Sequence, residues 1–150
     1  MKTVLIIGGS RGIGAGMAQL FLERGWAVAV CARTEGGSVS ELRENGALFF
    51  PCDISSEDET ERLRDGVLKL FHHLDALIYC AGNAWHGLLQ DMPTAAFDSL
   101  MDTHLRGAFF ALRAFLPSMV EQGSGSILLV SSMRGRTPGP VPSPGRSDRP

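Results

Sequence analysis

The chain has 150 residues, of which 44% are hydrophobic and 20% are charged, and its formal net charge is −2. This length and composition suffice for one globular domain with a hydrophobic core. The near-neutral charge gives no reason to expect nucleic acid or an anionic membrane surface as a partner.

Apolar runs in the sequence are all short. None approaches the eighteen or so consecutive residues that a membrane span requires. The run Val4–Ile7 near the start is also too short to form the core of a signal peptide. We therefore expect a cytoplasmic protein.

Four of these runs predict strands, and a weaker fifth lies between them. They are apolar at successive positions rather than at alternate ones, which is typical of strands buried on both faces of a parallel sheet. Amphipathic stretches between the runs predict helices. Alternation of strands and helices predicts an α/β fold with a parallel sheet. The predicted strands are 3–7, 27–31, 47–51 (the weaker one), 76–80 and 126–130, and the predicted helices are 14–24, 57–71 and 94–121.

Two of the predicted helices carry clear apolar faces. In the helix over 57–71, Leu63, Val67, Leu70 and Phe71 share one face. The helix over 94–121 has large apolar residues at three- and four-residue spacing along its length. Both faces are expected to pack on the sheet or on neighbouring helices.

The three cysteines, Cys31, Cys52 and Cys80, are far apart and lie in apolar stretches. An odd number at such spacing favours buried, reduced thiols over disulfides. No metal site is expected.

The last part of the chain has a different composition. Five of the eight prolines fall between residues 134 and 150, where Val141 is the only large aliphatic residue. Such a segment cannot bury enough apolar surface to offset the entropy of ordering. We therefore expect one folded domain over residues 1–132 and a disordered Pro/Gly/Arg-rich tail over 133–150.

A glycine-rich segment directly follows the first predicted strand and leads into the first predicted helix. Gly8, Gly12 and Gly14 allow a tight turn and a close approach of backbone N–H groups to a pyrophosphate. The partial positive charge of the helix N-terminus favours the same ligand. A tight turn without a ligand is the alternative, but the position between strand and helix favours a dinucleotide site.

Four segments carry a resemblance to a known family. The glycine segment at 8–14 reads GGSRGIG and resembles the cofactor loop of the short-chain dehydrogenase/reductase (SDR) family, whose usual form is T-G-x-x-x-G-I-G. Asp53 resembles the acid that contacts the adenine, and Cys80–Gly82 resembles the N-A-G after the fourth strand. Ser132 matches the catalytic Ser at the end of the next strand.

The resemblance covers about residues 3–132 and implies the fold and the cofactor site. It implies a Rossmann-like doubly wound parallel sheet, incomplete at its C-terminal side, with residues 1–132 as a partial NAD(P)-binding domain. The implied cofactor-binding residues are Gly8, Ser10, Arg11, Gly12, Ile13, Gly14, Arg33, Asp53, Ile54, Cys80, Ala81 and Gly82.

The charge after the second strand bears on the choice of cofactor. An NAD-selective site has an acid there for the ribose 2′-OH, whereas an NADP site has Arg for the 2′-phosphate. This chain has Arg33 there and Arg11 in the glycine segment, and both can bind one phosphate. Two solvated surface arginines are the alternative, and the nearby acid Glu35 argues for NAD. We expect NADP(H) to be favoured over NAD(H).

The catalytic set that the family implies is incomplete in this sequence. Ser132 stands at the position of the Ser that binds the substrate oxygen. His104 replaces the helix Asn of the proton relay, and a helix histidine with structural hydrogen bonds is the alternative. The Tyr and Lys of Tyr-x-x-x-Lys would fall near Gly145 and Arg149, but the only tyrosine is Tyr79.

The resemblance implies an oxidoreductase that transfers hydride between NADP(H) and a carbonyl or alcohol substrate. Without the Tyr and Lys we expect this chain to be a truncated, inactive form. A complete member could form a homo-oligomer. The alternative is a non-catalytic NADP(H)-binding module or subunit, although the retained Ser132 favours enzyme ancestry.

The composition also suggests how the Tyr and Lys were lost. Twelve arginines against two lysines are typical of GC-rich coding DNA. Out-of-frame reading of such DNA yields mostly Pro, Gly, Arg, Ala and Ser. We therefore expect a frameshift between Ser132 and Pro140.

Overall fold

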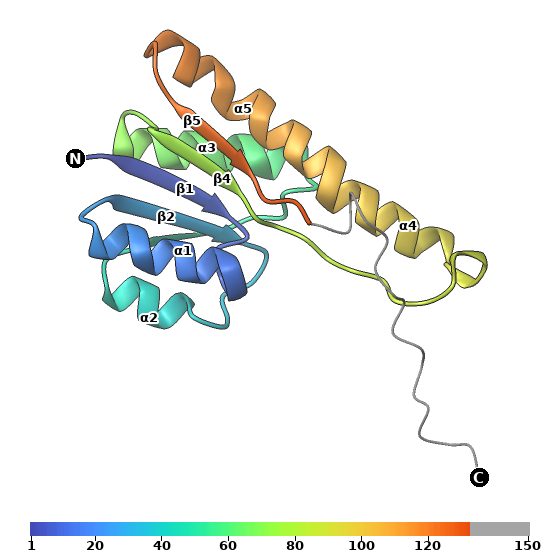
Figure 1. Ribbon diagram of the computed structural model, residues 1–150. Coiled ribbons are helices and arrows are strands. Elements are labelled where there is room, and N and C mark those ends of the chain that lie inside the picture. Colours follow the sequence, from blue (N-terminus) through green and yellow to red (C-terminus); the bar gives the residue numbers. More distant parts are fainter. Residues whose placement is uncertain (133–150) are drawn as a thin grey trace.

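The computed structural model describes residues 1–132, which form one parallel sheet with helices on both faces (Figure 1). The sheet order is β3-β2-β1-β4-β5, so the chain winds outward from β1 in both directions. This confirms the predicted doubly wound α/β fold. The strands are β1 (Thr3–Ile7), β2 (Ala27–Ala32), β3 (Leu48–Pro51), β4 (Ala76–Tyr79) and β5 (Ser126–Leu129).

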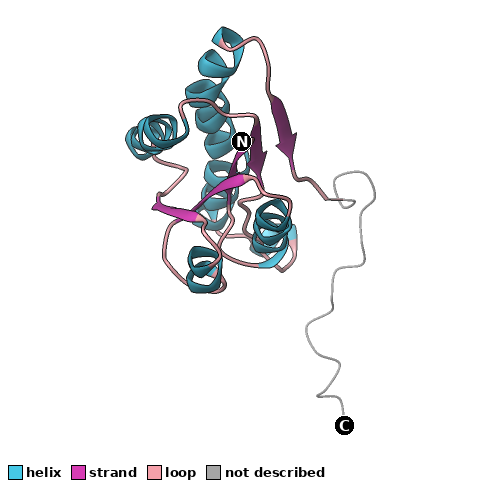
Figure 2. Cartoon of the chain, turned by 90° about the vertical axis from the view of Figure 1, so that its left-hand side faces the viewer, coloured by secondary structure: helices cyan, strands magenta, loops and turns pink. Residues whose placement is uncertain are grey.

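The helices separate into two layers. In Figure 1, α1 and α2 lie on one face of the sheet, whereas α3 and α5 lie on the other. Figure 2 shows the same arrangement after a turn of 90°. The helices are α1 (Gly12–Glu23), α2 (Val39–Glu44), α3 (Glu57–Phe71), α4 (Thr94–Met101) and α5 (Gly107–Glu121), with a 3₁₀ turn η1 (Leu89–Asp91) and a π-helical turn η2 (Asp102–Arg106).

Strand β1 is the centre of the hydrophobic core because both of its faces are covered. Leu5 and Ile7 pack in the cluster beneath α3 and α5, which includes the fully buried Phe115. Val4 and Ile6 pack in the opposite cluster beneath α1 and α2. This two-sided burial explains why the strand sequence is apolar at every position.

The predicted helix over 94–121 is continuous but irregular in the structure. Helix α4 ends at Met101, and the π-helical turn η2 separates it from α5. The apolar period of the sequence contains no signal for such a turn, because the side-chain pattern on either side of it stays close to helical.

The structure also differs from the predicted secondary structure in smaller, local elements. Helix α2 and the turn η1 were not predicted, because each is too short to show a period. Leu70 is 55% exposed and does not share the packed face of α3, so that part of the prediction was wrong. Leu63 and Val67 are buried as expected.

All three cysteines are free within the described chain. Cys31 and Cys52 are buried as predicted, whereas Cys80 is only partly buried. The tail predicted over 133–150, and with it the register positions near Gly145 and Arg149, lies outside the described residues.

Strand β5 is the exposed edge of the sheet. Its register pairs it with β4 alone among the strands of residues 1–132. Its apolar side chains are unusually accessible, with Leu128 at 50% exposure. Helices α4 and α5 expose a further row that includes Phe97 and Phe109. No helix in the described part of the chain has the length and apolarity to cross a membrane.

Candidate functional site

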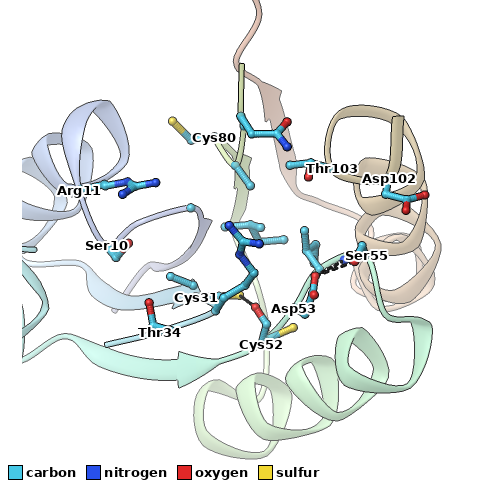
Figure 3. Close-up of a pocket in the computed structure, with 18 of the residues that line it drawn as sticks. Ser10, Arg11, Cys31, Thr34, Cys52, Asp53, Ser55, Cys80, Asp102 and Thr103 are labelled. Carbon is cyan, nitrogen blue, oxygen red and sulfur yellow. Dashed lines mark hydrogen bonds between the residues drawn. The ribbon is translucent and has the colours of Figure 1, made fainter. Parts of the chain in front are cut away.

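A cavity of about 800 Å³ opens at the carboxyl ends of the central strands. It lies where the sheet order reverses on either side of β1, which is where open α/β sheets bind ligands (Figure 3). All the predicted cofactor-binding residues line this cavity except Gly12 and Gly14. The fold therefore brings together segments that are separated by more than sixty residues in the sequence, such as Gly8 and Gly82.

The glycine segment passes closer to its neighbours than any side chain would allow. Gly8 has a φ of +86°, and a Cβ there would lie 2.5 Å from the backbone nitrogen of Ala81. A Cβ on Gly14 would lie 2.2 Å from the carbonyl oxygen of Gly8. The Gly8 N–H also donates a 2.8 Å hydrogen bond to the carbonyl of Cys31. The loop is thus fixed between β2 and the end of β4.

Helix α1 begins at this loop with its first turn uncapped. Arg11 occupies the N-cap position in an extended conformation, and its side chain makes no capping hydrogen bond. The first turn also has no acidic residue. A helix N-terminus without a side-chain cap, together with the helix dipole at this end, suits an anion.

Two arginines contribute positive charge to the cavity lining. Arg11 and Arg33 both line it and are exposed, and none of the salt bridges within residues 1–132 involves either of them. In Figure 3 the Arg11 side chain extends from the loop into the cavity. Glu35 is not in the cavity lining and forms an ion pair with Arg43 of α2. The acid that argued against a phosphate site is therefore already paired.

Asp53 provides a carboxylate after β3. Its Oδ1 accepts hydrogen bonds from the hydroxyl of Ser55 at 2.7 Å and from the backbone N–H of Ser55 at 3.0 Å. The Ser55 hydroxyl, followed by that backbone N–H and the charge of Arg33, holds the pKa of Asp53 below its ordinary value against a smaller opposing effect of burial. This side chain is an ionised acceptor at neutral pH.

The remaining wall of the cavity comes from α4 and the turn η2, and sequence reasoning missed it. A π-helical turn has no readable sequence pattern, so nothing indicated that this segment would face the loop after β4. The residues contributed by this wall are Ala95, Asp98, Ser99, Asp102 and Thr103.

Hydrogen bonds tie this wall to β4. The buried Tyr79 hydroxyl donates to the carbonyl of Thr103. Asn83 donates through Nδ2 to the Ser99 hydroxyl at 2.9 Å, and His104 Nε2 lies 2.8 Å from the carbonyl oxygen of Asn83. His104 does not line the cavity. Its ring links η2 to the loop after β4.

Tyr79 is unsuited to acid–base chemistry. Burial, followed by the nearby Cys31, Asp53 and Cys52, raises its pKa well above the ordinary value, and its hydroxyl is already hydrogen-bonded. Burial likewise raises the pKa of the Cys80 thiol.

In the described range, no group of three or more His, Cys, Asp or Glu side chains could hold a metal.

Ser132 follows β5 at the carboxyl edge of the sheet. The N–H of Val130 donates to the carbonyl of Tyr79 at 2.9 Å, which places the residues after it beside the end of β4. Ser132 is exposed and does not line the cavity.

A pair of glycine substitutions tests the tight packing of the loop. Gly14→Ala places a methyl group against the Gly8 carbonyl, so we expect it to lower the free energy of unfolding by about 2–3 kcal/mol. Gly16→Ala, two residues further along α1 and open to solvent, should instead raise it by about 0.5–1 kcal/mol. Urea denaturation measures both, and equal effects would show that the loop tolerates a side chain.

The lowered pKa of Asp53 predicts a pH-dependent contribution to stability. A carboxyl group whose pKa is lower in the folded protein than in the unfolded chain stabilises the fold at pH values above its unfolded pKa of about 3.9. That stabilisation is lost as the pH falls through the lower pKa of the folded state. Asp53→Asn keeps an acceptor oxygen but removes the charge, so it should cost less than about 1 kcal/mol at pH 7. The difference between the parent and the variant should vanish in strong acid, which thermal denaturation across pH would measure.

Comparison with known proteins gives the family. Residues 2–144 match the short chain dehydrogenase family. The match extends past residue 132, where we expected the resemblance to end. It therefore includes part of the segment attributed there to a frameshift.

The chain is similar to both curated and structurally characterised members. It is 32% identical to human 3-oxoacyl-[acyl-carrier-protein] reductase over 136 residues, which are 89% of this chain and 57% of the relative. An actinorhodin polyketide ketoreductase solved with NADPH has 30% identity and a TM-score of 0.87, covering 93% of this chain and 56% of that one. An NADH-dependent reductase complexed with NAD has 26% identity and a TM-score of 0.82, covering 93% of this chain and 63% of that one.

These matches concern only part of each relative, because the chain spans about half to three-fifths of their length. Within that span the two solved folds superpose on this chain with TM-scores of 0.87 and 0.82. This chain belongs to the short chain dehydrogenase family.

Proposed function

We propose that this chain binds NADP(H) and forms the cofactor-binding half of an oxidoreductase acting on a carbonyl or alcohol. The observation that carries the proposal is the cavity at the reversal of the sheet order, lined by a glycine-rich loop and by two arginines that form no salt bridge within residues 1–132. When bound, the cofactor would supply or accept the hydride.

The residues of the cavity fit the parts of a dinucleotide. The glycine segment and the uncapped start of α1 would hold the pyrophosphate, because a Cβ at Gly8 or Gly14 would fill the space that the loop needs. Asp53 and Ile54 would contact the adenine, and Cys80–Gly82 would support the adjacent ribose.

Arg11 and Arg33 support the choice of NADP(H) over NAD(H). Both are available to a 2′-phosphate, whereas the nearby acid Glu35 is paired with Arg43. Related structures carry NADPH in one case and NAD in another, so the preference rests on these side chains. Charge-assisted hydrogen bonds to the phosphate would provide the selectivity.

Arginine substitutions test the cofactor preference. We expect Arg33→Ala to weaken NADPH binding about tenfold or more and NADH binding less than about twofold, because only NADPH has the 2′-phosphate. Titration of cofactor fluorescence measures both affinities. Arg24→Ala is the control, since Arg24 is exposed at the other end of α1. An equal effect on both cofactors would contradict the preference.

We expect this chain to bind the cofactor without catalytic turnover. Ser132 stands at the substrate-binding position of the family, but the one tyrosine of this sequence is buried and engaged by Thr103. We infer that these 150 residues bind the cofactor without transferring hydride. A non-catalytic binding module would give the same result for the chain alone.

A chimera distinguishes the enzyme half from the binding module. The chain through Ser132 would be joined to the segment that follows the catalytic Ser in human 3-oxoacyl-[acyl-carrier-protein] reductase. The parent should bind NADPH but not oxidise it with a panel of carbonyls, whereas the chimera should oxidise it. Ser132→Ala in the chimera should reduce the rate by at least about a hundredfold. A folded, NADPH-binding chimera with no turnover would favour the binding module.

A further inference from the structure

We propose that Glu59 of α3 is a positioning residue that sets the specificity of the cavity for adenine. It acts through the backbone N–H of Asp53 and not by touching the ligand. This inference rests on the proposed function, since it concerns the base of the same cofactor.

The hydrogen bond lies where the sheet ladder ends. The last ladder bond of β3 runs from the N–H of Cys52 to the carbonyl of Ala32 at 3.0 Å. One residue later, the N–H of Asp53 donates to Glu59 Oε2 at 2.7 Å. The acceptor for this N–H is thus the carboxylate of Glu59, six residues further along the chain, and not a carbonyl of the neighbouring strand.

Helix capping alone does not explain this contact. Ser56 is the N-cap of α3, and its hydroxyl accepts from the N–H of Glu59 at 3.4 Å. In a capping box, the Glu at this position reaches back to the N–H of the N-cap residue itself. Here the N–H of Ser56 donates to the carbonyl of Asp53 at 3.0 Å. Glu59 instead accepts from the N–H of Asp53, which lies three residues before Ser56 and lines the cavity.

The rest of the turn is fixed by other groups. Thr60 Oγ1 donates to the carbonyl of Ser56 at 2.8 Å, and Ser55 occupies Oδ1 of Asp53. Among the described residues, none donates a hydrogen bond to the second oxygen, Oδ2. The Glu59 contact fixes the backbone on the strand side of Asp53, and the Ser55 contacts fix its side chain.

This arrangement suits recognition of a base that carries an amino group. A carboxylate oxygen without a donor accepts from the exocyclic amine of adenine, and an oxo group at the same place offers no proton. A site built around such a hydrogen bond discriminates only if its acceptor is held in place. Loss of the Glu59 contact frees the Asp53 backbone and should weaken that discrimination.

The test compares two cofactors that differ at one edge of the base, because in the analogue an oxo group replaces the amino group and the adjacent N1 carries a proton. NADPH and reduced nicotinamide hypoxanthine dinucleotide phosphate would be titrated against the 150-residue chain. We expect the parent to bind NADPH about tenfold more tightly than the hypoxanthine analogue. Glu59→Leu should reduce this ratio to about twofold or less, mainly by weakening NADPH binding.

Two control variants isolate the contact. Glu59→Gln keeps an acceptor oxygen for the Asp53 N–H and should retain most of the ratio. Asp58→Leu removes one negative charge from the same exposed turn of α3, and the ratio should not change. A ratio that is unchanged in Glu59→Leu, or lowered equally in Asp58→Leu, would overturn the inference.

Amide hydrogen exchange keeps the inference testable if Glu59→Leu fails to fold. In the parent and in Glu59→Gln, the Asp53 amide should exchange at least about tenfold more slowly than an unprotected amide. An unprotected Asp53 amide in the parent would overturn the inference. A parent chain that binds NADPH no more tightly than the hypoxanthine analogue would also overturn the inference. A parent that binds neither cofactor would instead refute the proposed function, and this inference with it.

Discussion

The approach of the Gly8 backbone to the backbone of Ala81 is the constraint on which the site depends. A Cβ at Gly8 would lie 2.5 Å from the Ala81 nitrogen, so the loop after β1 can lie against the end of β4 only without a side chain. That contact brings the start of α1 to the reversal point of the sheet. The first turn of α1, which has no side-chain cap, then opens onto the cavity.

Charge is distributed unevenly along the cavity that results. Arg11 and the N-terminus of α1 provide positive potential beside the glycine loop. The segment after β3 and the α4–η2 wall contribute carboxylates to the lining, namely those of Asp53, Asp98 and Asp102. A ligand with anionic phosphates and a hydrogen-bond-donating base is thereby favoured in one orientation over the reverse.

The features that could be predicted from the sequence are those with a local cause. Burial on both faces makes β1 apolar throughout, and the tight turn after it requires glycine at Gly8 and Gly14. These two features were enough to predict the parallel sheet and the part of the cavity lining near β1 and β2. The cofactor residues were assigned largely through the family resemblance, because Asp53 has no distinctive pattern of its own.

The features that could not be predicted depend on contacts between distant segments. The turn η2 is stabilised by the Tyr79 hydroxyl, which lies on a different strand, so the sequence around Asp102 contains no sign of it. Glu59 looks like an ordinary capping residue until the end of β3 is seen beside it. The exposure of β5 likewise follows from its place at the edge and not from its composition.

That edge position divides the carboxyl face of the sheet into two parts of unequal local stability. Strand β1 pairs on both sides and is wholly buried, whereas within the described chain β5 pairs with β4 only and all four of its residues are exposed. Edge segments with few buried contacts open locally at a lower free energy than the core. The strand that leads to Ser132 can therefore fray while the dinucleotide cavity, which is built on β1 to β4, keeps its shape.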